Sequence, residues 1–187
     1  MICSTAEVEA LVLRAARGAG LPVGAAQEIA GLIETLSAVD IPLWDDLIAT
    51  LTPPFEPVTT HDDGGALVFQ TARVARDGPG AIDAALCGRE VHLEALDAPG
   101  IMALLVQAAE RDFEIGLSDS AKVDGGPVVL RLGPFDPNDA SGNRRPLRMD
   151  VPDTVFNRLK ELAAKTYVPA SEASRRSGAG AGLTDND

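Results

Sequence analysis

The hydrophobic pattern of this 187-residue chain changes at Thr52-Pro53-Pro54, and this change constrains the fold more than any other feature. Before it, apolar residues recur three or four positions apart, which is the period of an α-helix. After it, they alternate every second residue in several short runs, which is typical of β-strands. The stretch from Pro53 to Gly65 is rich in Pro, Thr, Asp and Gly and marks an internal boundary. We therefore expect a helical segment over residues 1–51 and a sheet-containing region over residues 66–187, packed as one compact domain.

Three short helices are predicted before this boundary. Ser4 and Glu7 have the spacing of a capping box, in which each side chain accepts a hydrogen bond from the other residue's backbone N–H. Three stripes of apolar residues at helical spacing follow, from Val8 to Ala15, from Ala26 to Leu36 and from Leu43 to Leu51. Gly18 and Gly20 are expected to stop the first helix, because glycine tolerates the left-handed C-terminal turn. Helices of this length are marginal alone, so we expect them to pack on one another or on a further surface.

Strands and helices interleave beyond the boundary. Short apolar or alternating runs predict strands near residues 66–70, 90–95, 113–117, 127–132 and 146–151. Helices are predicted near residues 79–86, 97–108 and 152–163. Because the last strands follow one another without a helix, the pattern favours an α+β fold with a mixed β-sheet covered by helices over a strictly parallel sheet. The residues expected to point inward include Leu147, Met149, Val151, Leu159 and Leu162.

Composition limits the classes of partner. The formal net charge is −12 at pH 7, so neither nucleic acid nor an anionic membrane surface is an expected partner. No run approaches the ~18 apolar residues of a membrane span. The N-terminus lacks the basic start and apolar run of a signal peptide. Cys3 and Cys87 give no disulfide framework, so we expect two free thiols in a reducing cytoplasm, with Cys87 buried and inert.

The C-terminal stretch from Thr166 to Asp187 is the least typical part of the chain. It is rich in Gly, Ala and Ser, has no apolar run, and carries glycines at positions 178, 180 and 182. Glycine-rich loops bind phosphates between a strand and a helix, but no strand precedes these glycines, which argues against a nucleotide loop. Ordering such a tail has a high entropic cost. We therefore expect Ser171 to Gly182 to be held by backbone hydrogen bonds and charged contacts, on its own domain or on a neighbouring copy.

Two groups of arginines lie close to this tail in an otherwise acidic chain: Arg144, Arg145 and Arg148, then Arg175 and Arg176. Guanidinium groups bind carboxylates and phosphates through two parallel hydrogen bonds, so these groups predict a site for a small anionic metabolite. The simpler alternative for Arg176 is a surface ion pair with Glu172. The residues predicted to bind the ligand are Arg175, Arg176, Ser171, Tyr167, Glu172 and Arg145. If the protein is an enzyme, Glu172 or Tyr167 is the first choice for an acid or base.

A second hypothesis belongs to a different class of protein. The chain would be a structural or regulatory interaction subunit, and its Gly-rich tail would dock on a second copy or on another protein. Arginines of both groups converging on one pocket would favour ligand binding. A tail that extends away from its own domain would favour the interaction subunit.

The remaining polar residues give weaker signals. The last three residues offer oxygen ligands for Mg²⁺ or Ca²⁺, but their spacing fits no calcium loop, and a solvated acidic end is the simpler interpretation. His61-Asp62-Asp63 is interpreted as a polar turn and His92 as a surface histidine on a strand. Because the chain has only two histidines, neither a zinc site nor a histidine-based triad is expected. No metal is predicted, and the sequence names no cofactor.

The stretches from Glu7 to Ile33 and from Thr166 to Asp187 together resemble an uncharacterised bacterial family, a domain of unknown function. The resemblance implies that the tail belongs to the shared plan of that family, and it assigns no activity to any residue. Ala19 to Ala26 is also similar to the N-terminal helices of the malate and L-lactate dehydrogenase family of non-Rossmann type. The Ser-His-Gly motif of that family is absent, with Ser37-Ala38-Val39 near its place, and this chain is much shorter. Its cofactor and catalysis are therefore not expected here.

Overall fold

The structure of the protein is a computed structural model that describes residues 1–37, 43–55, 59–114, 116–119, 128–134 and 147–166. The helices within these ranges are α1 (Thr5–Ala19), α2 (Val23–Leu36), α3 (Trp44–Leu51), α4 (Val74–Leu86), α5 (Pro99–Phe113) and α6 (Asp153–Ala164). The strands are β1 (Ile2–Ser4), β2 (Thr60–Asp63), β3 (Ala66–Phe69), β4 (Glu90–Leu93), β5 (Gly116–Asp119), β6 (Val128–Gly133) and β7 (Arg148–Asp150). Helices come first and a helix-covered sheet follows, which confirms the α+β class.

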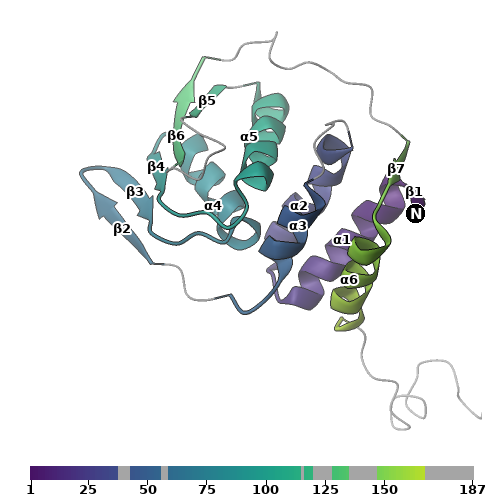
Figure 1. Cartoon of the computed structure of the whole chain (residues 1–187). Helices are drawn as coiled ribbons and strands as arrows, with labels where there is room; N and C mark the ends of the chain where they lie inside the picture. Colours follow the sequence, from purple (N-terminus) through teal and green to yellow (C-terminus); the bar gives the residue numbers. More distant parts are fainter. Residues whose placement is uncertain (38–42, 56–58, 115, 120–127, 135–146, 167–187) are drawn as a thin grey trace, which may run out of the picture.

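These elements form successive layers (Figure 1). The larger sheet lies on one side of the molecule, and α4 and α5 lie between it and α2. On the other side of α2 lies α1, and α6 packs on α1 away from the larger sheet. Because α3 contacts α4, α5 and α6, it connects the layers. A small sheet of β1 and β7 lies beside α1.

The larger sheet has the strand order β2-β3-β4-β6-β5. β3 and β4 are parallel and the other neighbours are antiparallel, so the sheet is mixed, as the sequence predicts. β2 and β3 form a hairpin whose turn residues Gly64 and Gly65 have φ of 58° and 101°, values that favour glycine. The face of the sheet that packs on the helices carries Val91, Leu93 and Leu130, which are fully buried.

The first helix begins and ends as its sequence predicts. Ser4 Oγ accepts a hydrogen bond from the Glu7 N–H at 3.2 Å, and Glu7 Oε2 accepts one from the Ser4 N–H at 2.9 Å. These two bonds complete the capping box. Gly20 ends α1 with φ of 103°, in the left-handed conformation that glycine adopts without strain.

Gly18 marks a close approach between α1 and α6. A Cβ atom at this position would lie 1.9 Å from the carbonyl oxygen of Leu162, so no larger residue fits unless one of the helices moves. Leu159 and Leu162 are fully buried, which confirms them as core residues. The last helix, α6, therefore packs on α1 and α3, which are far from it in sequence, and not on the larger sheet.

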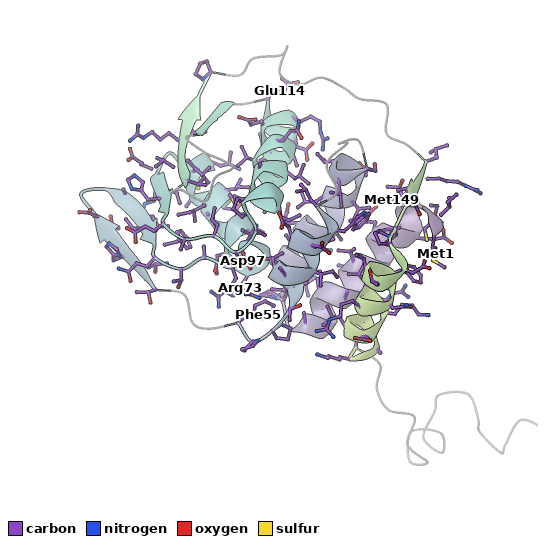
Figure 2. All side chains as sticks on the ribbon, in the orientation of Figure 1. Met1, Phe55, Arg73, Asp97, Glu114 and Met149 are labelled. Atoms are coloured by element: carbon purple, nitrogen blue, oxygen red, sulfur yellow. The ribbon has the colours of Figure 1, made fainter. Side chains whose placement is uncertain are left out.

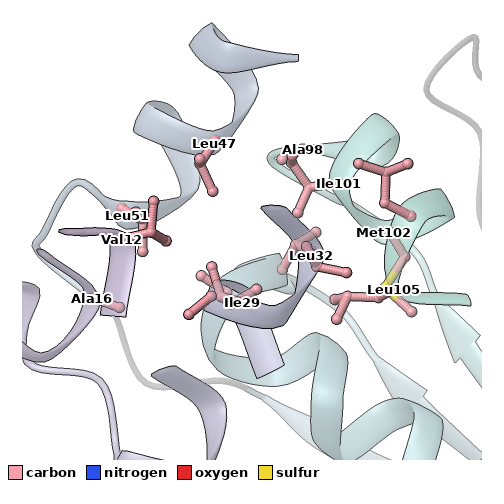
Figure 3. Close-up of a cluster of buried hydrophobic side chains, with 14 of the residues drawn as sticks. Val12, Ala16, Ile29, Leu32, Leu47, Leu51, Ala98, Ile101, Met102 and Leu105 are labelled. Atoms are coloured by element: carbon pink, nitrogen blue, oxygen red, sulfur yellow. The ribbon is translucent and has the colours of Figure 1, made fainter. Parts of the chain in front are cut away.

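One continuous hydrophobic core joins these layers. Figure 3 shows its central part, where Ile29 of α2 lies toward Val12 and Leu51, and Leu32 of α2 lies toward Ile101. α2 is thus enclosed by α1 on one side and by α4 and α5 on the other. This position explains why buried residues occupy most of the circumference of α2 and not a single stripe.

Two strands occur where none was expected. β1 lies at Ile2–Ser4, within the segment expected to be helical, because these residues pair with β7 from the other end of the chain. β2 lies in the stretch expected to be a boundary loop, because the Gly64-Gly65 turn brings it back along β3. All four residues of β2 are exposed, so it has no hydrophobic alternation from which a strand could be predicted.

Two predicted strands have different limits. α5 continues to Phe113, and Glu114 ends it in a left-handed conformation with φ of 51°, so β5 begins only at Gly116. β7 covers Arg148–Asp150, and Val151 is buried as expected. The expectation for Leu147 is wrong: it precedes β7 and its exposed fraction is 87%.

Candidate functional site

All six residues predicted to bind a ligand lie outside the described residues: Tyr167, Arg145, Ser171, Glu172, Arg175 and Arg176. The glycine-rich tail, Arg144 and the last three residues lie outside them as well. From the two arginine groups, the structure describes only Arg148, which is exposed on β7. The described part of the chain contains a groove and two polar clusters that could carry a function.

The groove has a volume of about 640 Å³ and lies between α1 and α6, beside β1. This volume is within the ~300–1,000 Å³ typical of small-molecule sites. The uncharged side chains of its lining are apolar or small: Met1, Ile2, Cys3, Ala10, Leu11, Phe156, Ala163 and Ala164. The N-terminal ammonium of Met1 is paired with Asp150 and Asp153. Its charged lining consists of Glu7, Arg14 and Lys160.

The three charged residues of the groove differ in their contacts. Glu7 accepts hydrogen bonds from the hydroxyl and the backbone N–H of Ser4, and these bonds hold the pKa of Glu7 below its usual value. Lys160 Nζ lies over the ring of Phe156, 5.7 Å from its centroid. Arg14 is exposed and has no hydrogen bond or ion pair with any residue that the structure describes. Arg14 and Lys160 are therefore available to an anion, whereas Glu7 is already engaged.

The first polar cluster surrounds Arg73, which lies close to Phe55 and Asp97 (Figure 2). Arg73 Nη2 donates to the carbonyl oxygens of Ala49, at 3.1 Å, and Thr52, at the C-terminal end of α3. Arg73 Nε lies 3.2 Å from Asp97 Oδ2, in an ion pair that lacks hydrogen-bond alignment. The guanidinium carbon lies 5.6 Å from the ring centroid of Phe55. One side chain thus connects the end of α3 to the loop before α5.

The register of the parallel strands explains this pairing. Ala72 forms a parallel bridge with Leu96, so the following residues, Arg73 and Asp97, lie opposite each other. Asp97 Oδ1 also accepts a hydrogen bond from the Val74 N–H at 2.8 Å, at the start of α4. The carboxyl ends of parallel strands are a common ligand site in α/β proteins. Here the protein's own side chains and the end of α3 fill that place, so the cluster is a structural junction.

Two more polar residues complete the junction. Thr50 is fully buried, and its Oγ1 accepts a hydrogen bond from the Ala75 N–H at 2.9 Å. Asp77 is 7% exposed; it accepts one bond from the Arg73 N–H, at 2.9 Å, and one from Arg76 Nε, at 2.6 Å. The N–H groups at the start of α4, which have no acceptor within the helix, are thus satisfied by side chains.

The second polar cluster lies on the face of the larger sheet that points away from the helices. Arg131 donates to Glu90 through Nε, at 2.6 Å, and Nη2, at 2.7 Å. His92 lies on β4 with a side chain that is 35% exposed, as expected of a surface histidine on a strand, and its Nε2 lies 2.5 Å from Glu90 Oε1. The bonds from Arg131 and then from His92 lower the pKa of Glu90 to about 2. His61, expected in a turn, lies on β2. β2 pairs with one edge of β3, and β4, which carries His92, pairs with the other edge.

Neither cysteine is in a disulfide. Cys3 is half-buried beside the groove, and Cys87 is exposed, which corrects the expectation of a buried thiol. Cys87 is exposed because it lies at the C-terminal end of α4. Within the described ranges, no three His, Cys, Asp or Glu residues are grouped so that they could hold a metal ion. In the same ranges, no helix has the length and apolar character needed to cross a membrane.

A profile of the family described as "Protein of unknown function (DUF3726)" matches residues 3–104. Because this range is more than half of the chain, the protein belongs to that family. The match contains the helical hairpin on which the resemblance rested and the Arg73–Asp97 junction, and it ends within α5; the tail and α6 lie beyond it. No curated protein and no solved structure is detectably similar to the chain.

Sequence reasoning did not single out Arg14, Lys160, Arg73 or Asp97. A signal existed for the junction, because Arg73 and Asp97 each follow an apolar strand run by a few residues. No comparable signal existed for the groove. Its walls come from α1 and α6, and their contact depends on tertiary packing that no local pattern encodes.

Proposed function

We propose that this protein binds a small metabolite with one anionic group and an apolar body, in the groove between α1 and α6. The observation that carries the proposal is the pair of cations, Arg14 and Lys160, on an otherwise mainly apolar lining. Neither cation has an acidic partner among the residues that the structure describes. This proposal keeps the anionic ligand that the arginine groups predict and adds a place for its apolar part.

The chemistry of the lining favours a monocarboxylate. The guanidinium of Arg14 can donate two parallel hydrogen bonds to a carboxylate, and Lys160 supplies a second positive charge. Leu11 and Phe156 would cover an alkyl or aryl body, at about 25 cal/mol per Å² of apolar surface removed from water. A phosphate, with its higher charge, would be repelled more strongly by the ionised Glu7 in the same lining.

The tail and the loop before β7 are proposed to contribute to the same site. Ala164, the last residue of α6, lines the groove, and Tyr167 is only three residues further along the chain. The proposed contributors are Tyr167, Ser171, Glu172, Arg175, Arg176 and Arg145. Catalysis is not part of the proposal, because the described groove holds no pair of groups arranged as acid and base.

Thermal unfolding with matched ligands tests the proposal. Octanoate and other short- or medium-chain monocarboxylates should raise the melting temperature, by roughly 5–10 °C at a hundredfold excess over Kd. Octanol has the same apolar body without the charge and should produce a much smaller shift. The proposal is wrong if no monocarboxylate raises the melting temperature more than its neutral analogue.

Matched variants locate the binding site. Arg14→Gln and Lys160→Met should each reduce the octanoate-induced shift, because each removes a charge from the groove. Arg17→Gln is the control: Arg17 is also exposed on α1, but it does not line the groove. Deletion of residues 171–187 tests the tail separately, and it should weaken the shift only if the tail contributes to the site.

We also propose that the protein functions in the cytoplasm. Both thiols are free, with Cys87 exposed, and a reducing compartment preserves such thiols. Cell fractionation followed by immunodetection of the full chain would test this location directly.

A further inference from the structure

The strand β7 has one edge without a neighbouring strand among the described residues. On its other edge it pairs with β1, where the Val151 N–H donates to the Met1 carbonyl at 2.9 Å and the Thr5 N–H donates to the Leu147 carbonyl at 3.2 Å. Backbone groups of a strand point alternately to its two sides. The backbone groups of Arg148 and Asp150 therefore point away from β1, to the open edge.

The outer edge of β1 is not equally available. The Ser4 N–H donates to Glu7 Oε2 at 2.9 Å, within the capping box of α1. The chain enters α1 directly after Ser4, so the strand cannot be extended on that side. The open edge of β7 is therefore the place at which this two-stranded sheet can grow. Sheets of two strands are marginal alone, and an open edge is a template for another strand.

We propose that β7 pairs with β7 of a second copy of this chain, antiparallel, about a two-fold axis at Met149. The resulting sheet would have the order β1-β7-β7-β1. Charge self-complementarity favours this register: Arg148 lies opposite Asp150 of the second copy, and the same pair is repeated by the symmetry. This inference is independent of the proposed ligand site.

Like-charge repulsion and the alternation of side chains between the two faces of a sheet disfavour the neighbouring registers. An axis at Arg148 would place two arginines opposite each other, and an axis at Asp150 would place two aspartates opposite each other; like charges at such positions are destabilising. An axis between two residues would pair the outward face of one strand with the inward face of the other. Only the axis at Met149 joins opposite charges and keeps Met149, which packs against the core, on the inner face of both strands.

The charges that surround this edge leave the pairing intact. Asp150 Oδ1 lies 2.9 Å from the amino group of Met1, and Asp153 lies 3.4 Å from the same group, so two carboxylates share one ammonium. The side chain of Asp150 is still 82% exposed. Arg148 is exposed and is attracted by the nearby Glu7, but no carboxylate in the described part of the chain lies within 4 Å of it. Each copy therefore offers a cation and an anion on the same edge.

The proposed pairing would also cover an apolar side chain that is exposed to solvent in the isolated chain. Leu147 has an exposed fraction of 87% directly before β7. In the register with the axis at Met149, Leu147 lies opposite Val151 of the second copy, next to a position that is fully buried in each chain. Exposed apolar residues beside an open edge are typical of association surfaces.

Light scattering after size exclusion tests the proposal on the full chain. The wild type should have the mass of a dimer at ~100 μM, with dissociation on dilution. Arg148→Asp and Asp150→Arg should each raise the dimer dissociation constant about tenfold or more, because each places like charges opposite each other twice. The double variant Arg148→Asp/Asp150→Arg reverses both charges, restores opposite pairs and should recover most of the wild-type affinity.

Arg111→Asp provides the control, because it makes the same charge change on α5, away from β7 (Figure 1), at a side chain that is 37% exposed, and it should leave the dimer unaltered. Circular dichroism of each variant should match that of the wild type, since Arg148 and Asp150 are exposed. A monomeric wild type at ~100 μM overturns the proposal. A dimer that both single variants leave intact, or that the double variant does not restore, overturns it as well.

Discussion

The cations of the larger sheet and its loops differ from those of the groove between α1 and α6. On the sheet side, the described arginines at positions 73, 76, 89 and 131 all have carboxylate partners within 4 Å. In the groove, neither Arg14 nor Lys160 has such a partner among the described residues, and Lys160 Nζ lies over the ring of Phe156. In an acidic protein with 28 carboxylates, an unpaired cation is unexpected. The comparison separates arginines that hold elements together from cations that remain available to a ligand.

The largest effect is expected at the junction. Arg73→Met should lower the free energy of unfolding by about 3 kcal/mol, because it leaves Asp97 with a largely buried charge and removes the donor to Ala49 and Thr52. This figure is at the lower end for a broken buried pair, since the Arg73 side chain is 29% exposed. Denaturant titration measures the change.

An exposed pair provides the control for this variant. Arg89→Met breaks the pair of Arg89 with Asp62, whose side chains are 40% and 65% exposed, and should cost no more than about 1 kcal/mol. Equal losses in the two variants would mean that the junction contributes no more than a surface contact.

The second prediction concerns the wall of the groove. Gly18→Ala should destabilise the protein by about 1–3 kcal/mol, although alanine is the better helix former, because the new methyl group collides with the Leu162 carbonyl. Gly31→Ala, within α2, meets no atom within 4 Å and should stabilise the protein by about 0.5–1 kcal/mol. Thermal unfolding of the two variants gives the comparison. A stabilising Gly18→Ala would contradict the close packing of α1 on α6.

The third prediction sharpens the contrast between structural and available cations. Without ligand, the double variant Arg14→Gln/Lys160→Met should change the free energy of unfolding by no more than about 1 kcal/mol, since its main structural loss is the contact of Lys160 with Phe156. With octanoate, the same variant should lose most of the ligand-induced stabilisation. A loss of stability as large as that of Arg73→Met would assign the groove cations a structural role.

The smallest effect is expected for Glu90. Its pKa is lowered from 4.5 to about 2 in the folded protein, so its pairing stabilises the fold above pH 4.5 and is lost as the pH falls toward 2. Glu90→Gln should therefore be slightly less stable than the wild type at neutral pH, and this difference should shrink between about pH 4.5 and 2. Denaturant titrations of both proteins across this range measure it. A difference that does not depend on pH would show that the charge of Glu90 is not its source.

The sequence predicted the features that depend on local chemistry. The capping box of Ser4 and Glu7, the end of α1 near Gly20, the mixed sheet and the burial of Leu159 are all confirmed, because each follows from residue spacing within one or two elements. β1 and the groove could not be predicted, because both depend on contacts between the two ends of the chain. β2 has only exposed residues, so no alternation marked it.

The candidate site was less predictable than the fold. Periodicity identifies which face of a helix is apolar, but it does not say which other helix covers that face. For this reason Arg14 and Lys160 did not stand out as neighbours, and the prediction was based on arginines in the tail, which the described residues do not include. The prediction for Leu147 failed for a related reason. Alternation predicted an inward side chain, but β7 begins one residue later.

The packing of α6 on α1 has a consequence for the order in which the molecule can form. During synthesis, α1 leaves the ribosome before α6, so one side of α1 stays uncovered until all the elements between the two helices have been made. Contacts between such distant segments slow folding, because a long loop must close before they form. The range that the family profile matches, residues 3–104, ends before α6. A polypeptide limited to that range would leave the Gly18 side of α1 uncovered and prone to aggregation.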